Sequence, residues 1–159
     1  MLGMVFVRFL SIGLLAGAVI AVALLSRSGH LVPTGDFHQW SLSVLLTLNF
    51  GQFLTVPTAL LVFAWKGTRR GRPPLKRPGL LLGICTIVFG LFVMRLGLST
   101  AGWIDTGAVA YGLGDPDAKY LLATFNVFLG AVTLTIGALI SVVKIVSVLT
   151  VWQRRRKAS

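Results

Sequence analysis

Glutamate is absent from this chain of 159 residues, and aspartate occurs only four times, against 15 lysines and arginines. Charged residues make up 12% of the sequence, about half of the roughly 25% that is usual in soluble domains. The four aspartates fall between the long apolar segments or at their ends. Proton-coupled transport usually relies on a carboxylate within the membrane, so this class of transporter is not favoured.

Cysteine and histidine are nearly as scarce. Cys85 is the single cysteine, which excludes an intramolecular disulfide and a cysteine-based metal cluster. It lies in an apolar run, so we expect it to be buried as a small hydrophobic residue. His30 and His38 share one turn-rich segment, and a haem held between two helices has no ligands there. The sequence predicts no enzyme, no metal site and no cofactor.

Apolar residues are abundant instead. They make up 55% of the chain, and the mean hydropathy is +0.87. Four apolar segments lie at about 2–25, 41–65, 79–98 and 117–152, each long enough for the roughly 20 helical residues that cross a bilayer. Backbone groups in lipid need internal hydrogen bonds, which favours helices. The sequence predicts an all-α integral membrane protein, with residues 1–159 forming a single domain of four transmembrane helices.

Basic residues gather in two segments, the connection 66–78 and the C-terminal tail. They are Lys66, Arg69, Arg70, Arg72, Lys76, Arg77, Arg154, Arg155, Arg156 and Lys157. Four spans place both segments on one side, whereas the connections at about 26–40 and 99–116, with their edges, hold only Arg27 and Lys119. Cytoplasmic loops carry the excess of lysine and arginine. We therefore expect both termini in the cytoplasm, in a bacterial inner membrane.

The basic segments also indicate partners. Anionic lipid head groups attract each such base by about 1 kcal/mol near the surface. The nine bases from Lys66 to Arg77 and from Arg154 to Arg156 are the predicted contacts for lipid or for a cytoplasmic partner. Single-stranded nucleic acid needs aromatic side chains for base stacking, and only Trp65 adjoins the first segment. Nucleic-acid binding is not expected.

Amide side chains lie inside two of the predicted spans. Asn49 and Gln52 are three residues apart and so share a helix face. Asn126 lies in the fourth span. Such groups either form hydrogen bonds between helices or line a path for a transported molecule. Both alternatives remain open from the sequence.

Three bases also lie within the predicted spans. Arg8 and Lys144 are near the predicted cytoplasmic side, where long side chains reach the interface. Arg95 is near the opposite end of its span. It either extends to the interface or pairs with Asp36 or Asp105.

Glycines recur at helical intervals in three of the spans. The positions predicted to pack helices together are Gly13, Gly17, Gly83, Gly90, Gly130 and Gly137. Small residues at spacings of four and seven let helix backbones approach closely. They predict a packed bundle, and we expect the first and third spans to present contact faces to partner proteins.

These observations favour a non-catalytic membrane subunit that packs within a larger complex of the secretion, conjugation or respiratory type. Its partners would be other membrane subunits and anionic lipids. The alternative is a small lipid or solute translocator. In that case Asn49, Gln52, Arg95 and Asn126 would surround a polar path.

Overall fold

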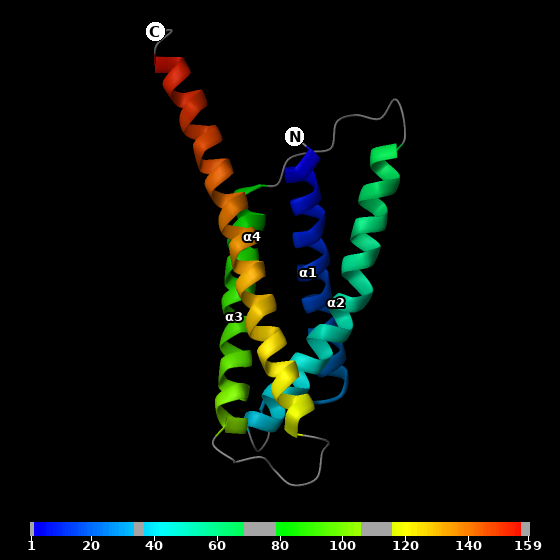
Figure 1. The fold of residues 1–159 in the computed structure, drawn as a ribbon. Coiled ribbons are helices and arrows are strands. Elements are labelled where there is room, and N and C mark those ends of the chain that lie inside the picture. The colour runs from blue at the N-terminus through cyan, green and yellow to red at the C-terminus, as the bar shows by residue number, and fades with distance from the viewer. Residues whose placement is uncertain (1, 34–36, 69–78, 106–115, 157–159) are drawn as a thin grey trace.

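The computed structural model describes residues 2–33, 37–68, 79–105 and 116–156, and these form four helices joined by short segments (Figure 1). The helices are α1 (Leu2–Arg27), α2 (Phe37–Thr68), α3 (Leu80–Asp105) and α4 (Pro116–Arg156). Each contains a stretch of 23 to 36 residues that is long and apolar enough to cross a membrane. The prediction of an all-helical chain with four such segments is confirmed.

The helices end two to seven residues beyond the ends of the predicted spans. α4 begins at Pro116, where a proline fits because it lacks the N–H that the first helical turn leaves unpaired. α2 continues through Pro57 without ending. At the end of the bundle where α4 begins, Gly29 follows α1 with a left-handed φ of 76°, the usual conformation for a helix C-terminus.

The four helices form two antiparallel hairpins, α1 with α2 and α3 with α4. Most contacts between helices lie within these pairs, and each helix touches the other hairpin much less. The start of α1 and the end of α4 lie at the same end of the bundle (Figure 1). At the opposite end, the indole N–H of Trp40 donates a 2.9 Å hydrogen bond to the carbonyl of His30, which ties the start of α2 to the turn before it.

Glycines allow the backbones of α1 and α2 to touch. A Cβ atom on Gly17 would lie 2.8 Å from Cα of Gln52, and one on Gly51 would meet the carbonyl oxygen of Gly17. Nearby, the hydroxyl of Thr55 donates a 2.6 Å hydrogen bond across the pair to the carbonyl of Gly13. The close approach therefore depends on the absence of side chains at these glycines and is reinforced by the Thr55–Gly13 hydrogen bond.

The α3–α4 hairpin repeats this arrangement every seven residues. The facing pairs are Gly83 with Gly137, Gly90 with Gly130, and Gly97 with Ala123. A Cβ on Gly90 would lie 2.8 Å from the carbonyl oxygen of Gly130. All six glycines predicted to pack helices thus lie against another helix of the same chain. The glycine faces of α1 and α3 are covered by α2 and α4, so these faces are not free to contact a partner protein.

The hydrophobic core joins the two hairpins in the half of the bundle near the α1–α2 turn. It includes Leu14, Leu45, Leu48, Val93 and Leu96.

Cys85 is exposed on α3, so the expectation that it is buried was wrong. Gly83 and Thr86 on the neighbouring positions are buried, and Gly83 packs on α4. That packing turns Cys85 toward the outer surface, where apolar side chains are equally well accommodated in a membrane helix.

A candidate binding cleft between α2 and α4

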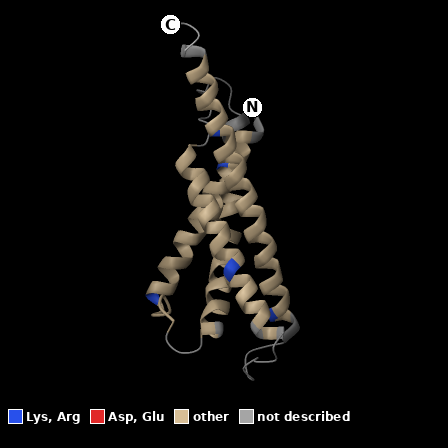
Figure 2. Ribbon diagram, turned by 90° about the vertical axis from the view of Figure 1, so that its left-hand side faces the viewer, with Lys and Arg blue, Asp and Glu red and all other residues tan. Residues whose placement is uncertain are grey.

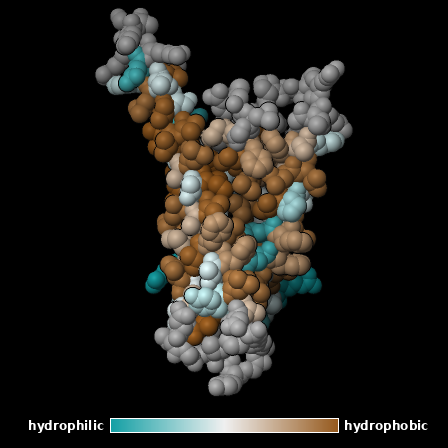
Figure 3. All heavy atoms as spheres, in the orientation of Figure 1, coloured by the Kyte–Doolittle hydropathy of each residue, from teal (hydrophilic) through white to brown (hydrophobic). Residues whose placement is uncertain are grey.

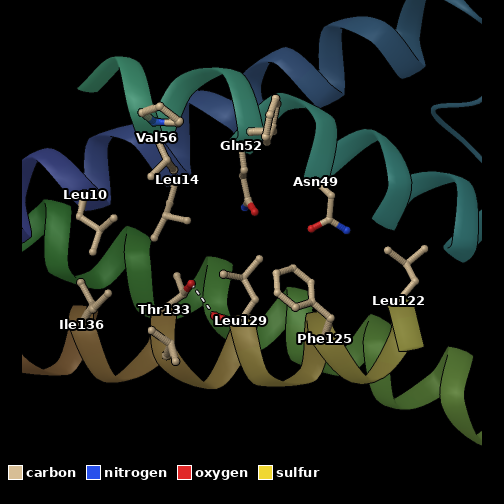
Figure 4. Close-up of a pocket in the computed structure, with 13 residues that line it drawn as sticks. Leu10, Leu14, Asn49, Gln52, Val56, Leu122, Phe125, Leu129, Thr133 and Ile136 are labelled. Carbon is tan, nitrogen blue, oxygen red and sulfur yellow. Dashed lines mark hydrogen bonds between the residues drawn. The ribbon is translucent and has the colours of Figure 1, made fainter. Parts of the chain in front are cut away.

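A cleft of about 530 Å³ opens between α2 and α4, which belong to different hairpins. Leu10 and Leu14 of α1 line its base (Figure 4). Phe53 and Phe125 stand at its edges and are 77% and 52% exposed. In the space-filling view, hydrophilic atoms coloured teal lie within an otherwise brown face between these helices (Figure 3).

Two amides and one hydroxyl are the polar side chains among the residues that line the cleft, and they come from α2 and α4. Asn49 and Gln52 both point into it from α2 (Figure 4). Asn49 donates through Nδ2 to the carbonyl of Leu45 at 2.9 Å, which leaves its side-chain oxygen directed into the cleft (Figure 4). Thr133 on α4 donates to the carbonyl of Leu129 at 2.7 Å.

Gln52 differs from its neighbours because its amide nitrogen is buried without a hydrogen-bond partner among the described residues. The side chain is 6% exposed. Its Cγ atom lies against Gly17, where a Cβ would approach it to 2.8 Å. The glycine lets α2 sit close to α1, so the amide extends across the base of the cleft toward α4 (Figure 4). Gln52 is also at the centre of the apolar stretch Gln39–Trp65.

Asn126 and Arg95 lie outside this cleft. Asn126 is fully buried and donates to the carbonyl of Leu122 at 2.8 Å. It shares a helix face with Ala123 and Gly130, which pack on α3. Arg95 is exposed on α3. The structure therefore brings together Asn49 and Gln52, and it separates them from the other two residues of the predicted polar path.

Most of the predicted basic contacts cannot be placed. Arg69, Arg70, Arg72, Lys76 and Arg77 lie outside the described residues. The side chains of Lys66, Arg154, Arg155 and Arg156 are likewise not described, although their backbones end α2 and α4. Both helix ends lie at the same end of the bundle as the start of α1 (Figure 1).

The possible partners of Arg95 likewise cannot be placed. Asp36 and the side chain of Asp105 are not described, so this ion pair stays a prediction. Figure 2 shows how widely the remaining lysines and arginines are spaced along the helices.

Sequence reasoning missed two polar features. Lys119 was counted with the outer connection, but it lies in the first turns of α4 and is 8% exposed. Ser41 and Thr100 form a buried hydroxyl pair 2.9 Å apart that links α2 to α3. Helical periodicity could have placed each hydroxyl on a face, but it gives no signal for which helix lies opposite.

The Ser41–Thr100 hydrogen bond is a direct link between the hairpins, and this makes it testable. We expect Ser41→Ala and Thr100→Val each to lower the free energy of unfolding by about 1 kcal/mol, because each leaves one buried hydroxyl without its interhelical partner. Chemical unfolding in detergent would measure this, with the double variant costing less than the sum. Thr135→Val is the matched control, since Thr135 is exposed and bonds only to its own helix among the described hydrogen bonds. Additive effects would contradict the coupling.

Within the described residues, no group of three or more histidine, cysteine, aspartate or glutamate side chains could hold a metal ion. Comparisons with models of protein families, with curated proteins and with solved structures found no match. The class that the fold supports is a four-helix protein of membrane-spanning dimensions, and any narrower function rests on the chain's own geometry.

Proposed function

We propose that this chain is a non-catalytic subunit of a larger assembly in the bacterial inner membrane, with both termini in the cytoplasm. The projecting end of α4 carries the proposal. Because Gly83 faces Gly137, the first residue of α3, Leu80, is level with Ile140. α4 continues through residues 141–156, about 24 Å at 1.5 Å per residue. It rises beyond the other helices (Figure 1).

This projection is mostly apolar, with Lys144, Ser147 and Thr150 lying between its apolar side chains. Val142, Ile145, Val146, Leu149 and Val151 are each 48–57% exposed. The apolar stretch of α4 has 36 residues and a length of about 54 Å. A 30 Å hydrocarbon layer crossed at a tilt of 40°, the upper end of the usual range, accommodates about 39 Å. Lipid tails therefore cannot cover all of this surface, and an apolar surface of another membrane subunit would.

The proposal predicts partners that co-purify in stoichiometric amounts after extraction in a mild detergent. Ile145→Ala with Leu149→Ala should reduce that yield at least several-fold, because both side chains belong to the projection. Leu121→Ala with Phe128→Ala is the matched control, since these residues are 70% and 68% exposed lower on the same helix. Mass spectrometry of the purified material would identify the assembly. A homogeneous species without partners would count against the proposal.

The basic segments support a second contact of the same subunit. With ten bases in residues 66–78 and 154–157, anionic lipid head groups would bind at about 1 kcal/mol per base near the surface. Binding by the six lysines and arginines of residues 66–78, which connect α2 to α3, would hold the start of the α4 projection close to the cytoplasmic leaflet.

A small lipid or solute translocator is the second candidate, and the cleft favours it because Asn49 and Gln52 lie there together. The two candidates respond differently to one double change. Asn49→Leu with Gln52→Met should abolish flux of a fluorescent phospholipid in reconstituted vesicles if the chain is a lipid translocator. If the chain is a structural subunit, the same change leaves co-purification intact.

A further inference from the structure

We propose that the cleft between α2 and α4 binds one neutral, mostly apolar molecule from the lipid phase, and that a carbonyl or hydroxyl oxygen of this molecule accepts a hydrogen bond from the amide of Gln52. The inference goes beyond the proposed subunit role and does not depend on it. Its basis is the combination of an apolar cleft with a buried donor directed into it.

The donor is the first step. Nε2 of Gln52 is buried without a partner among the described residues, and the side chain is 6% exposed. A buried polar group without a hydrogen bond is costly, so such groups in folded proteins are nearly always paired. Asn49 already donates to its own helix, and so does Thr133. Among these three side chains, Gln52 is therefore the one whose donor still lacks an acceptor, and an oxygen of a bound molecule would supply it.

The depth of Gln52 selects the kind of molecule. It lies at the centre of the apolar stretch Gln39–Trp65, and the hydrocarbon layer extends about 15 Å to either side of the midplane. The ester groups of a phospholipid lie near the head groups, so its acyl chains bring no acceptor to this depth. A molecule that resides within the hydrocarbon and carries its own oxygen does.

The size of the cleft separates a small molecule from a helix. About 530 Å³ falls within the roughly 300–1,000 Å³ of small-molecule sites. Ten residues of a helix about 10 Å wide and 15 Å long occupy more than about 1,000 Å³. A partner helix could cover the opening between Phe53 and Phe125 but could not enter it.

The absence of charge on the walls of the cleft further restricts the class of ligand. Every residue that lines the cleft is uncharged. A carboxylate or phosphate at this depth would have no cation among the lining residues, and burial of an unpaired charge is strongly unfavourable. The ligand is therefore neutral, and its polar content matches the few polar groups on the walls.

Native mass spectrometry of the detergent-solubilised full chain tests the proposal with three probes. Decylubiquinone offers a carbonyl oxygen, farnesol offers a hydroxyl, and squalane is a hydrocarbon without an acceptor. We expect one molecule of decylubiquinone or of farnesol to bind per chain, and squalane to bind at least several-fold more weakly. Tighter binding of decylubiquinone would identify the acceptor as a carbonyl, and tighter binding of farnesol would identify it as a hydroxyl.

The informative variant is Gln52→Met, which removes the donor and keeps an unbranched side chain. A side chain branched at Cγ would crowd Gly17, since Cγ of Gln52 lies against it. We expect the affinity for the oxygenated probe to fall about two- to tenfold, the effect of one lost hydrogen bond. Gln39→Met makes the same change at an exposed position of α2 and should leave binding unchanged.

Four results would overturn the proposal. Two concern the probes: neither oxygenated probe binds, or squalane binds as tightly as they do. Two concern the variant: Gln52→Met binds the oxygenated probe as tightly as the wild type, or the wild type is a dimer that Gln52→Met converts to monomers. The last result would show that a second copy covers the cleft. If Gln52→Met does not fold, infrared spectroscopy of the wild-type protein decides. The carbonyl band of bound decylubiquinone, or the hydroxyl band of bound farnesol if that is the ligand, shifts when the oxygen is hydrogen-bonded, and an unshifted band refutes the contact.

Discussion

Replacing Gly90 by alanine should lower the free energy of unfolding by about 1–3 kcal/mol, the range typical of overpacked interiors. The added Cβ would lie 2.6 Å from the backbone nitrogen of Leu134 and 2.8 Å from the carbonyl oxygen of Gly130. These are main-chain atoms, so no side-chain rotation relieves the clash. The whole of α4 has to move away, which also loosens the contacts at Gly83 and Gly97.

The same substitution on the same helix supplies the control. A Cβ on Gly102 would meet nothing within 4 Å. Gly102→Ala should therefore raise stability by about 0.5–1 kcal/mol, the usual gain from replacing a helical glycine. Urea or heat unfolding in one detergent, followed by circular dichroism, measures both variants. If both changes had the same sign, the glycine contacts would not be what holds α3 against α4.

The glycines also show how much of the helix packing the sequence can predict. Their spacing of seven in α3 and α4 predicts a packing face on each helix. Spacing alone does not say whether that face meets a helix of the same chain or a partner, because periodicity fixes a direction and not a neighbour. In the structure the glycines of α3 and α4 face one another from Gly83 and Gly137 onward, so these faces are not free for the partner contacts expected there.

The cleft illustrates the same limit. The three-residue spacing of Asn49 and Gln52 predicts their shared face, and the structure places both in one site. That α4 lies opposite, rather than α3, follows from how the two hairpins assemble. The sequence does not reveal that Asn126 and Arg95 lie outside the cleft, because their positions depend on which helix each residue faces.

Cys85 shows a different source of error. In a soluble domain an apolar run around a cysteine usually indicates burial. On a membrane helix the outward face is equally apolar, as the exposed Leu81 and Val88 on α3 show. Hydropathy therefore identifies the four long helices correctly and says little about which of their residues lie inside the bundle.

Neutralising the basic segments should change the orientation of the chain in the membrane. Replacing all ten bases at positions 66–77 and 154–157 with glutamine turns the predicted count from ten against two into zero against two. Since lysine and arginine in short loops set orientation, we expect an inverted or mixed population. Replacing only the four bases of the tail leaves six against two and should preserve the original orientation.

Labelling of introduced cysteines in intact cells reads out the result. Cys85 is first replaced by alanine, and Ser26→Cys, exposed at the end of α1, or Ser159→Cys is then added. In the otherwise unchanged chain, a membrane-impermeant maleimide should label Cys at position 26 directly and Cys at position 159 only after lysis. In the ten-base variant position 159 should become accessible from outside. Labelling at position 159 in the parent chain would mean that the cationic segments face outward, and the projecting end of α4 would then meet its partners on the opposite side of the membrane.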